Sequence, residues 1–374
     1  MIASNQTKLF TPIQVGSIGL KHRVVLAPLT RARASAGTAV PADFAADYYS
    51  QRASDGGLLI TEGTFIAEEA GGIAHVPGIY SSEQIAAWKK ITDAVHAKGG
   101  FIFCQLWALG RVANPDIVST VWSAGSKKFA PEGAAEFAQD KFTVMSEADI
   151  DRFVDHYRQA ALNAIEAGFD GVEIHGANGY IIDQFLQANS NDRTDAYGGS
   201  LENRFRFPLR VLNAVAEAVG PGRVGVRMSP FSRFQGMREA EPLRVFVPWA
   251  KAIVNAQPNL AYVHAVEPRT EGSSDVPDHE RVVEDSLHEI RQAVSDAGVT
   301  FVVAGGYLPE AAVRHASETD DLIAFGRYFI PNPDLPARVK NGWPLAKYNR
   351  RLFYAQTKEG YIDYPTYDSD DAGH

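Results

Sequence analysis

The chain has 374 residues, of which 45% are hydrophobic and 22% charged, and its formal net charge is −9. This composition is typical of a globular protein, and it argues against disordered and fibrous chains. The acidic balance argues against nucleic-acid and anionic-membrane partners, and no apolar run approaches the length of a membrane-spanning helix. The start, MIASNQTKLF, lacks the basic and apolar regions of a secretory signal, which favours a cytoplasmic protein.

The only cysteine in the chain is Cys104. A single thiol cannot form an internal disulfide, an iron–sulfur cluster or a cysteine-rich zinc site, and we expect no metal. Cys104 could be a nucleophile, but it lies in the apolar run FIFCQLW. We therefore interpret it as a buried structural thiol.

The predicted elements begin with a hairpin over residues 9–20, followed by eight short apolar runs. These runs read as strands buried on both faces, because they are nearly continuous in Val, Ile, Leu and Phe. They span residues 24–28, 58–63, 101–107, 171–176, 224–230, 260–268, 301–306 and 322–327.

Each apolar run is followed by a segment with helical periodicity. The segments span residues 43–53, 81–99, 146–168, 200–220, 242–256, 283–298, 308–318 and 333–342. Ser81 with Gln84 and Ser146 with Asp149 have the spacing of helix-capping pairs. Strands that alternate with helices indicate parallel βαβ units, and eight units predict a closed (β/α)₈ TIM barrel; a doubly wound sheet is the alternative.

The residues outside this repeat predict where the barrel is covered. The hairpin could plug the barrel floor, whereas residues 108–143 and 269–280 form long excursions on the carboxyl-terminal face. A connection as long as residues 108–143 is usually a functional cover. We expect a single barrel domain over residues 1–374.

One motif matches a dinucleotide-binding fingerprint but does not stand in the position that this fingerprint requires. GPGRVG, residues 220–225, matches the dinucleotide fingerprint G-x-G-x-x-G. That fingerprint works between a strand and the helix it precedes, but here it follows a predicted helix and precedes a predicted strand. We interpret it as a helix end and turn.

Two adjacent predicted strand ends could bind a phosphate. The seventh and eighth strands end in AGGY and FGRYF, so Gly305, Gly306 and Gly326 allow backbone amides to approach an anion. Arg327 adds a planar set of donors that suits a phosphate. The alternative is that these glycines simply end strands, but two such ends with an arginine favour a phosphate.

Two further strands carry polar groups where apolar ones are expected. Arg227, in the fifth strand, is costly unless it faces a negative group: Glu173, Glu62 or a cofactor that acquires negative charge. His175 and Asn178 follow the fourth strand, so their donors could converge on one oxygen. A satisfied strand-end histidine beside a capping asparagine is the alternative.

These motifs together resemble the Old Yellow Enzyme family of FMN-dependent ene-reductases, and most closely its fungal members. The residues that carry the resemblance are Thr-Arg after APL, CQLW, HGANGY, NDRTDAYGGSLENRFRF, VRMSP, AGGY, FGRYF and the tail YAQTKEGYIDYPTY. The resemblance extends from Leu9 to Tyr367. The combination of HxxNxY with DxYGGSxENR is very specific.

The resemblance implies FMN bound across the barrel mouth. Its phosphate would lie at Gly305, Gly306, Gly326 and Arg327. Gln105 would bind the pyrimidine edge, Arg227 would lie near N1 and the C2 carbonyl, and Thr30 would donate to the C4 carbonyl. Pro28, Leu29 and Gly63 would contact the ring through their backbone.

The resemblance also implies the chemistry. His175 and Asn178 would bind a carbonyl oxygen, hydride would pass from FMN N5 to the β-carbon, and Tyr180 would protonate the α-carbon. NADPH would bind in the same place to reduce the flavin, which makes the reaction ping-pong. Phenolic ligands would bind the same donor pair. Trp107, Phe234 and Tyr354 are candidate pocket walls, and ordinary packing is their alternative role.

Two positions depart from the family pattern and bear on the substrate. Ile73 stands where many members have a tyrosine, and the loop over residues 269–280 lacks an aromatic residue often found there. The expected activity is NADPH-dependent reduction of α,β-unsaturated aldehydes or ketones by a monomer or homodimer. The alternatives are a biosynthetic reductase or isomerase acting on an alkaloid-type enal, and a flavin-bound phenol- or steroid-binding protein with little turnover. The single cysteine excludes the iron–sulfur dienoyl reductase type.

Overall fold

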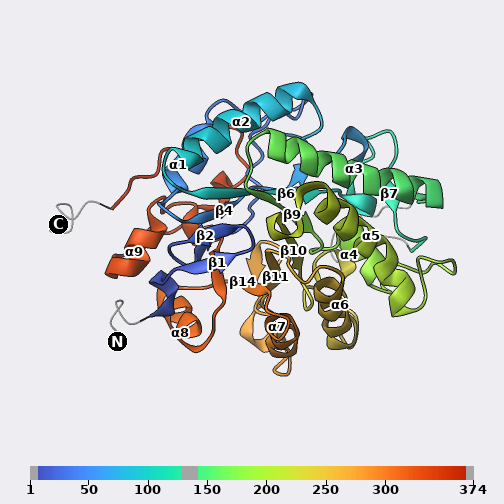
Figure 1. Ribbon diagram of the computed structural model, residues 1–374. Coiled ribbons are helices and arrows are strands. Elements are labelled where there is room, and N and C mark those ends of the chain that lie inside the picture. The colour runs from blue at the N-terminus through green and yellow to red at the C-terminus, as the bar shows by residue number, and fades with distance from the viewer. Residues whose placement is uncertain (1–6, 128–141, 368–374) are drawn as a thin grey trace.

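A closed barrel of eight parallel strands forms the centre of the molecule in the computed structural model, which describes residues 7–127 and 142–367 (Figure 1). The barrel strands are β3 (Val24–Leu26), β4 (Leu58–Ile60), β6 (Phe101–Trp107), β9 (Gly171–His175), β10 (Val224–Met228), β11 (Tyr262–Val266), β14 (Thr300–Ala304) and β15 (Leu322–Phe325). They pair in sequence order, β15 pairs with β3, and β4 pairs with β6 in register Leu58↔Phe101. The predicted TIM barrel is confirmed. The doubly wound alternative is wrong, because its sheet would have open edges.

Helices surround the barrel on the outside, and the eight predicted helical segments are all present. The helices are α1 (Ala45–Arg52), α2 (Ser82–His96), α3 (Glu147–Glu166), α4 (Ile181–Leu186), α5 (Leu201–Val219), α6 (Leu243–Ala256), α7 (His288–Ser295), α8 (Pro309–Glu318) and α9 (Leu335–Asn341). Both predicted capping boxes form: Ser81 with Gln84, and Ser146 with Asp149. The short α4 was not predicted, and α7 begins five residues later than predicted.

Several strands end before their predicted carboxyl ends. β4, for example, ends at Ile60; the N–H of Thr61 still donates to the Phe103 carbonyl at 2.9 Å, and its hydroxyl donates to the carbonyl of Glu62 at 2.8 Å. GPGRVG begins at the residue after α5, forms a turn over Pro221–Arg223 and ends in the first two residues of β10, so the predicted helix end and turn is confirmed. A backbone that turns away from the ladder exposes its amides at the mouth of the barrel.

The amino-terminal hairpin closes the floor of the barrel. β1 (Ile13–Val15) pairs antiparallel with β2 (Ile18–Leu20), and the Ser17 amide donates to the Gly222 carbonyl at 2.9 Å. Val15, Ile18 and Leu20 are buried against the barrel interior. The predicted plug is therefore present at the amino ends of the strands, and the central cavity lies at their carboxyl ends.

The two long excursions differ in their role. Residues 269–280 form a small antiparallel hairpin, β12 (Thr270–Glu271) with β13 (Ser274–Asp275), which borders the barrel mouth. In the other excursion, β7 (Trp122–Ser123) pairs with β8 (Thr143–Val144), and none of its described residues lines the central cavity. The described part of this loop packs behind the cavity wall instead: Leu109, Ala113 and Val121 share a hydrophobic cluster with Trp107, and the Trp122 ring lies 6.0 Å from that of Phe153. The expectation of a cover over the site is not met by these residues; residues 128–141 lie outside the described part.

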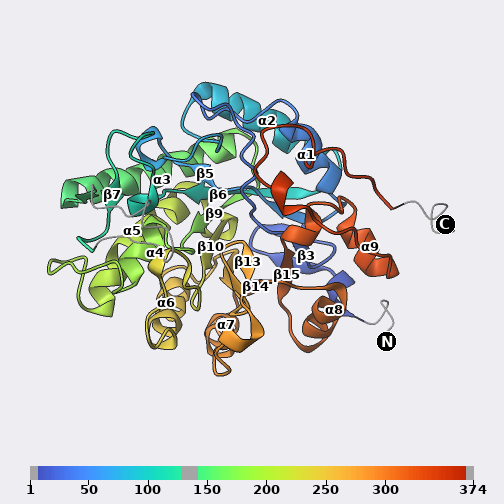
Figure 2. The same ribbon diagram turned by 180° about the vertical axis from the view of Figure 1, so that it is seen from behind.

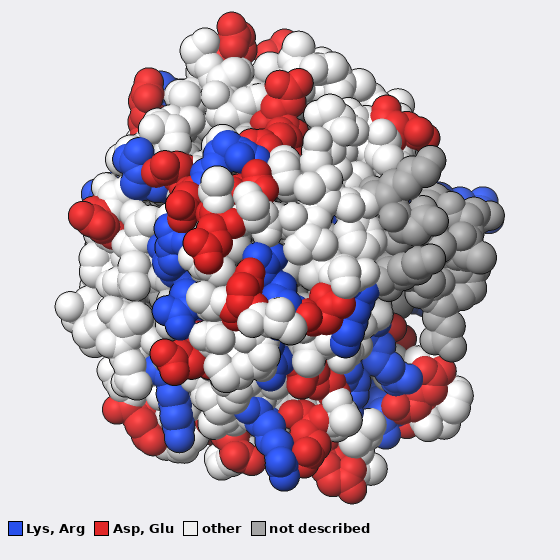
Figure 3. Space-filling model, turned by 90° about the vertical axis from the view of Figure 1, so that its right-hand side faces the viewer, with Lys and Arg blue, Asp and Glu red and all other residues white. Residues whose placement is uncertain are grey.

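The surface carries no extended basic face in the view of Figure 3, where acidic and basic side chains are interspersed. Among the residues described, no helix combines the length and the apolar character that a membrane crossing requires.

Three buried arginines bind the carboxyl-terminal segment to the barrel, and this segment runs back over α1 (Figure 2). Arg31 donates to the carbonyls of Phe353 and Gly360, and Arg33 donates to those of Leu352, Phe353, Thr357 and Glu359. Arg52 donates to the carbonyls of Tyr48, Phe329, Ile330 and Tyr361. These contacts position the segment that contributes Phe353 and Tyr354 to the central cavity.

Replacing Arg52 with methionine should strongly destabilise the protein. The change keeps most of the side-chain volume but leaves buried carbonyls from α1, the eighth strand end and the tail without donors, and each costs about 1–3 kcal/mol. We expect a loss of more than about 3 kcal/mol in the free energy of unfolding, measured by urea denaturation. Arg158→Met, on the exposed face of α3, is the control and should change it by less than about 0.5 kcal/mol.

Candidate active site

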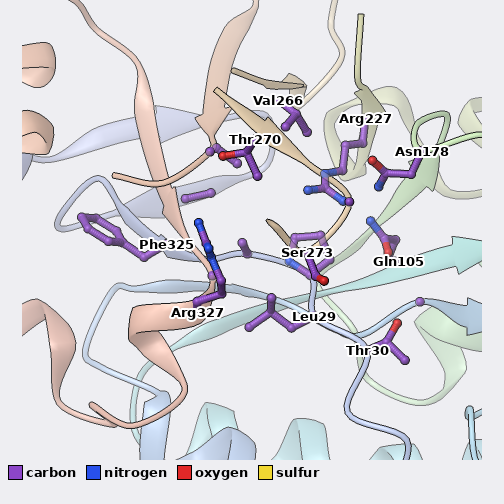
Figure 4. Close-up of a pocket in the computed structure, with 18 of the residues that line it drawn as sticks. Leu29, Thr30, Gln105, Asn178, Arg227, Val266, Thr270, Ser273, Phe325 and Arg327 are labelled. Carbon is purple, nitrogen blue, oxygen red and sulfur yellow. The ribbon is translucent and has the colours of Figure 1, made fainter. Parts of the chain in front are cut away.

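A cavity opens at the carboxyl ends of the barrel strands and collects every site residue that the sequence indicated (Figure 4). Those residues are Pro28, Leu29, Thr30, Gly63, Gln105, Trp107, His175, Asn178, Tyr180, Arg227, Phe234, Gly305, Gly306, Gly326, Arg327 and Tyr354. They come from the ends of seven strands and from the tail. Because the carboxyl ends of parallel strands meet at one face, residues separated by more than 300 positions line one space.

Gln105 and Arg227 form the polar floor of the cavity. The Gln105 amide nitrogen donates to a Glu173 carboxylate oxygen at 2.7 Å, and the other oxygen of Glu173 is 2.8 Å from His264 Nδ1. Arg227 is partly exposed to the cavity, but its Nε is buried and has no hydrogen-bond partner among the described residues. Burial lowers the pKa of Arg227, and the negative charge of Glu173 opposes this shift. A guanidinium with a buried, unused Nε donor fits a ligand that presents an acceptor or a negative charge.

Three rings form a compact wall above the floor. The Trp107 ring stacks on that of His175 at 5.9 Å, and Tyr180 contacts both rings edge-on, at 4.7 Å from Trp107 and 5.0 Å from His175. A β-carbon on Gly63 would lie 2.4 Å from the Trp107 ring, so only glycine fits there. This packing fixes the orientation of the histidine and the tyrosine relative to each other.

The surroundings of His175 indicate its tautomer. The backbone N–H of Ala177 donates to His175 Nδ1 at 3.3 Å, which leaves the proton of a neutral imidazole on Nε2. Burial lowers the pKa of His175 well below its usual value, and Arg227 and His264 lower it further. His175 is therefore a neutral hydrogen-bond donor through Nε2 at physiological pH.

The loop that carries Asn178 and Tyr180 is held at each backbone group between them. Asn178 has a positive φ of 59°; its N–H donates to Ser229 Oγ at 2.7 Å and its carbonyl accepts from Gln235 at 2.8 Å. The Gly179 N–H donates to the Asp183 carboxylate at 2.9 Å, and its carbonyl accepts from Gln184 at 2.7 Å. The Asn178 amide is thus directed to the same space as Arg227 and Gln105 (Figure 4).

Tyr180 contributes a phenolic O–H group to the wall of the cavity. Burial raises its pKa above the usual tyrosine value. The phenol therefore stays protonated at neutral pH and is able to donate a proton or a hydrogen bond. A neutral imidazole, an amide and a phenol around one apolar space can bind a carbonyl oxygen and supply a proton beside it.

The seventh and eighth strand ends form a cradle for an anion. Gly305 and Gly306 have φ angles of 127° and 64°, and a β-carbon on Gly305 would lie 2.8 Å from Glu267. Near Gly306, Arg269 Nη2 and Thr270 Oγ1 are buried and have no hydrogen-bond partner in the described chain. Unused donors beside glycine amides fit a phosphate.

Arg327 borders this cradle, but its guanidinium is engaged by a carboxylate. Asp275, on β13, accepts from Arg327 through both of its oxygens, with Nη1 to Oδ2 at 2.8 Å. The ion pair raises the pKa of Arg327 and lowers that of Asp275. Sequence reasoning missed Asp275, because a carboxylate in a polar loop gives no signal until the loop folds back over the eighth strand end.

The rim is formed by side chains that remain partly open to solvent. Phe234 and Tyr354 are 39% and 51% exposed, whereas Trp107 is only 2% exposed. Of the cavity-lining residues that sequence reasoning missed, Thr270, Gly272, Ser273, Tyr307 and Phe353 lie on the hairpin, beside the cradle and on the tail. A polar or aromatic residue in such a segment has no local pattern that would mark it.

Cys104 does not take part in the cavity, and its predicted role as a buried thiol is confirmed. Burial raises its pKa to about 12, so the reactive thiolate is not formed at neutral pH. No cluster of His, Cys, Asp or Glu in the described part of the chain could hold a metal ion.

Comparison with known proteins identifies the relatives of this chain. Residues 8–346 match the NADH:flavin oxidoreductase / NADH oxidase family. A chanoclavine-I aldehyde reductase of Penicillium roqueforti is 48% identical over 366 residues, and a flavin oxidoreductase of Emericella nidulans is 44% identical over 376. The alignments cover 96% of this chain and 96% and 97% of the two relatives, respectively.

A solved structure gives the same result. The Old Yellow Enzyme homologue of Zymomonas mobilis superimposes with a TM-score of 0.86 at 37% identity, over 96% of this chain and 100% of that one. The barrel fold of this chain therefore has a close counterpart in an Old Yellow Enzyme homologue. The chain belongs to the NADH:flavin oxidoreductase / NADH oxidase family and is an oxidoreductase and flavoprotein of the Old Yellow Enzyme type.

Proposed function

We propose that this protein is an FMN-dependent, NADPH-oxidising ene-reductase that reduces the C=C bond of α,β-unsaturated aldehydes or ketones. The observation that carries the proposal is that His175, Asn178 and Tyr180 line one cavity together with Arg227, whose buried Nε has no partner among the described residues. Two neutral donors and a protonated phenol match the needs of a conjugated carbonyl better than those of a charged substrate.

The residues present fit FMN. Arg227 Nε is a buried donor without a partner, and the cradle at Gly305 and Gly306 has the open backbone that a phosphate needs. Gln105, Thr30 and the backbone of Pro28, Leu29 and Gly63 would hold the ring, and Gly326 and Arg327 would complete the phosphate site. When bound, FMN supplies the hydride that it has first accepted from NADPH.

The protein groups would act on the substrate in two ways. His175 Nε2 and the Asn178 amide would donate to the carbonyl oxygen and stabilise the negative charge that develops there. Tyr180 would give its phenolic proton to the α-carbon and regain it from solvent. Trp107, Phe234 and Tyr354 would form the apolar walls, and the same donor pair would bind a phenolate. The described chain offers no second dinucleotide site, which favours one shared site and a ping-pong order.

The first test is a single turnover. The protein is reduced anaerobically with NADPH, cyclohexenone is added, and the return of the flavin absorbance is followed. We expect rapid reoxidation with formation of the saturated ketone. Tyr180→Phe should slow reoxidation roughly 10²–10⁴-fold, because the proton donor is lost, while reduction by NADPH stays close to that of the wild type.

His175→Leu should slow reoxidation roughly 10²–10³-fold and should also abolish phenol binding, because one carbonyl donor is removed. Tyr180→Phe is the matched control, since it keeps both carbonyl donors and should retain phenol binding. A wild-type flavin that stays reduced with every enone and enal tested, while phenols bind tightly, would instead indicate a phenol- or steroid-binding protein.

A narrower activity is favoured by one relative. The 48% identical fungal protein is a chanoclavine-I aldehyde reductase, which suggests a biosynthetic enal as the substrate of this chain. A panel of small and bulky enals, each paired with an enone of matched size, distinguishes a pathway enzyme from a general ene-reductase. A strong preference in kcat/KM for bulky enals supports a pathway enzyme, and similar values across the panel support a general ene-reductase. Product analysis separates reduction from isomerisation, and size-exclusion chromatography separates monomer from homodimer.

Asp275→Asn should strengthen FMN binding to the apoprotein. In the apoprotein Asp275 occupies the Arg327 guanidinium, so the flavin phosphate has to compete with this carboxylate. Because the Asp275 side chain is half exposed, its charge is screened, and we expect a roughly three- to tenfold lower Kd in a fluorescence titration. Riboflavin, which lacks the phosphate, is the control ligand and should bind both proteins equally. Weaker FMN binding by the variant would contradict competition and show that Asp275 orients Arg327.

A further inference from the structure

A fully buried carboxylate lies beneath the cavity floor, on the strand that leads to His175. Glu173 is 0% exposed and does not line the cavity. Its two oxygens are bound separately, one by the Gln105 amide at 2.7 Å and the other by His264 Nδ1 at 2.8 Å. The three residues lie on β6, β9 and β11, so their side chains meet inside the barrel; Gln105 lines the cavity, whereas Glu173 and His264 lie beneath it.

Arg227 carries the only formal charge among the floor residues of the described cavity. It lies on β10, between the strands that carry Glu173 and His264. β10 pairs with β9 on one side and with β11 on the other, and Arg227 is in register with His264. Arg227 has a free buried Nε that faces no protein acceptor. The positive charge of the floor is therefore close to one buried negative charge.

The protonation states in this cluster follow from its contacts. Burial opposes ionisation of Glu173, but His264, Arg227 and the Gln105 hydrogen bond together lower its pKa below the usual value. Burial lowers the pKa of His264 despite the nearby carboxylate. Glu173 is thus ionised and His264 is a neutral donor. The floor is close to electrically neutral with Glu173 present, and would carry one positive charge without it.

We propose that Glu173 sets the reduction potential of the bound flavin by balancing the charge of Arg227. The proposal rests on the flavin site argued above and identifies Glu173 as a positioning residue, since it touches neither cofactor nor substrate. Two electrons enter the flavin from NADPH and leave to the conjugated carbonyl. The Glu173 carboxylate changes the reduction potential of the flavin, and so the relative ease of its reduction and its reoxidation. It takes no direct part in the hydride transfer of either half-reaction.

The direction of the effect follows from Coulomb's law. The reduced flavin bears more negative charge than the oxidised one, and charges inside a protein interact more strongly than in water. Glu173 therefore disfavours reduction and keeps the potential low enough for the electrons to pass on to the substrate. Removal of its charge leaves Arg227 unopposed and should raise the potential.

Other buried carboxylates near the site lack this arrangement. Glu62 is buried but accepts from the backbone N–H groups of Arg31 and Ala32, outside the barrel interior. Asp183 accepts from the Gly179 N–H and from Gln187, and so holds the Tyr180 loop. Both bind backbone amides, whereas Glu173 binds two side chains in the layer beneath the floor.

The test compares two substitutions of Glu173 by the potential of the bound FMN, measured by equilibration with a reference dye. Glu173→Gln removes the charge and keeps a side chain that can accept from Gln105. We expect the equilibrium between oxidised and reduced flavin to move at least tenfold toward reduction, a positive shift of about 30 mV or more for a two-electron couple. Glu173→Asp keeps the charge but shortens the reach to Gln105 and His264, and should stay within half of that shift.

Two further variants test whether the shift in potential is specific to Glu173 and whether it persists with a different uncharged side chain. Asp321→Asn removes a buried carboxylate at the amino end of β15, the opposite end of the barrel, and should leave the potential unchanged. Glu173→Met is a second uncharged variant, used if Glu173→Gln does not fold, and the same positive shift is expected. All variants are compared at equal FMN occupancy.

An unchanged or more negative potential in the uncharged variants would overturn the proposal. Equal shifts in Glu173→Gln and Glu173→Asp would also overturn it, because the effect would then come from the hydrogen bonds and not from the charge. A wild-type protein that fails to bind FMN would refute the proposed function first, and this inference with it; a wild-type protein that binds FMN separates the two.

Discussion

The pairing of β4 with β6 is the interaction on which the site depends. It joins the second and third strands of the repeat and so closes the parallel sheet into a ring, with the hairpin β1–β2 covering its floor. Without closure, the strands that carry Thr30 and Arg327 would lie far from the strand that carries His175. Parallel pairing places the carboxyl ends of all eight strands on one face of the barrel. The β1–β2 hairpin covers the opposite face, so the cavity lies among the carboxyl ends. The arrangement of the cavity residues is thus a consequence of how the sheet closes.

Hydrogen bonds and ring packing hold the polar groups of the site in fixed orientations. Every backbone donor and acceptor of Asn178 and Gly179 has a specific partner, and the ring packing of Trp107 orients His175 and Tyr180. Such restraint is what a site needs if it is to stabilise charge that exists only during the reaction, because no reorganisation is then required. The Arg31, Arg33 and Arg52 contacts extend this restraint to the tail that forms the rim.

Charge within the barrel is arranged in layers. Arg227 lies in the floor, Glu173 and His264 lie beneath it, and the neutral donors His175 and Asn178 lie on its wall. The anion cradle is separated from this cluster and has its own cations, Arg327 and Arg269. This separation suits a ligand with a phosphate at one end and a redox-active ring at the other, and it agrees with membership of a flavin oxidoreductase family.

The sequence by itself determined the repeat of eight strands and eight helices, the floor hairpin, the capping boxes and the residues at the strand ends. These features depend on local periodicity and on residue chemistry, such as Ser81 with Gln84 or the glycines of AGGY, and they do not require knowledge of distant contacts. The three-residue spacing of His175 and Asn178 is equally local. The resemblance to a family then assigned these residues their expected roles.

Only the tertiary structure decided which of these groups meet and in what state. The capture of Arg327 by Asp275, 52 positions away, and the binding of Glu173 by side chains from β6 and β11 depend on loop return and strand order. The sequence likewise could not show that the described part of residues 108–143 packs against Trp107 without lining the cavity, or that three arginines bind the carboxyl-terminal segment. Ion pairs, burial and tautomers arise from contacts between segments far apart in the chain, and local sequence patterns carry no record of those contacts.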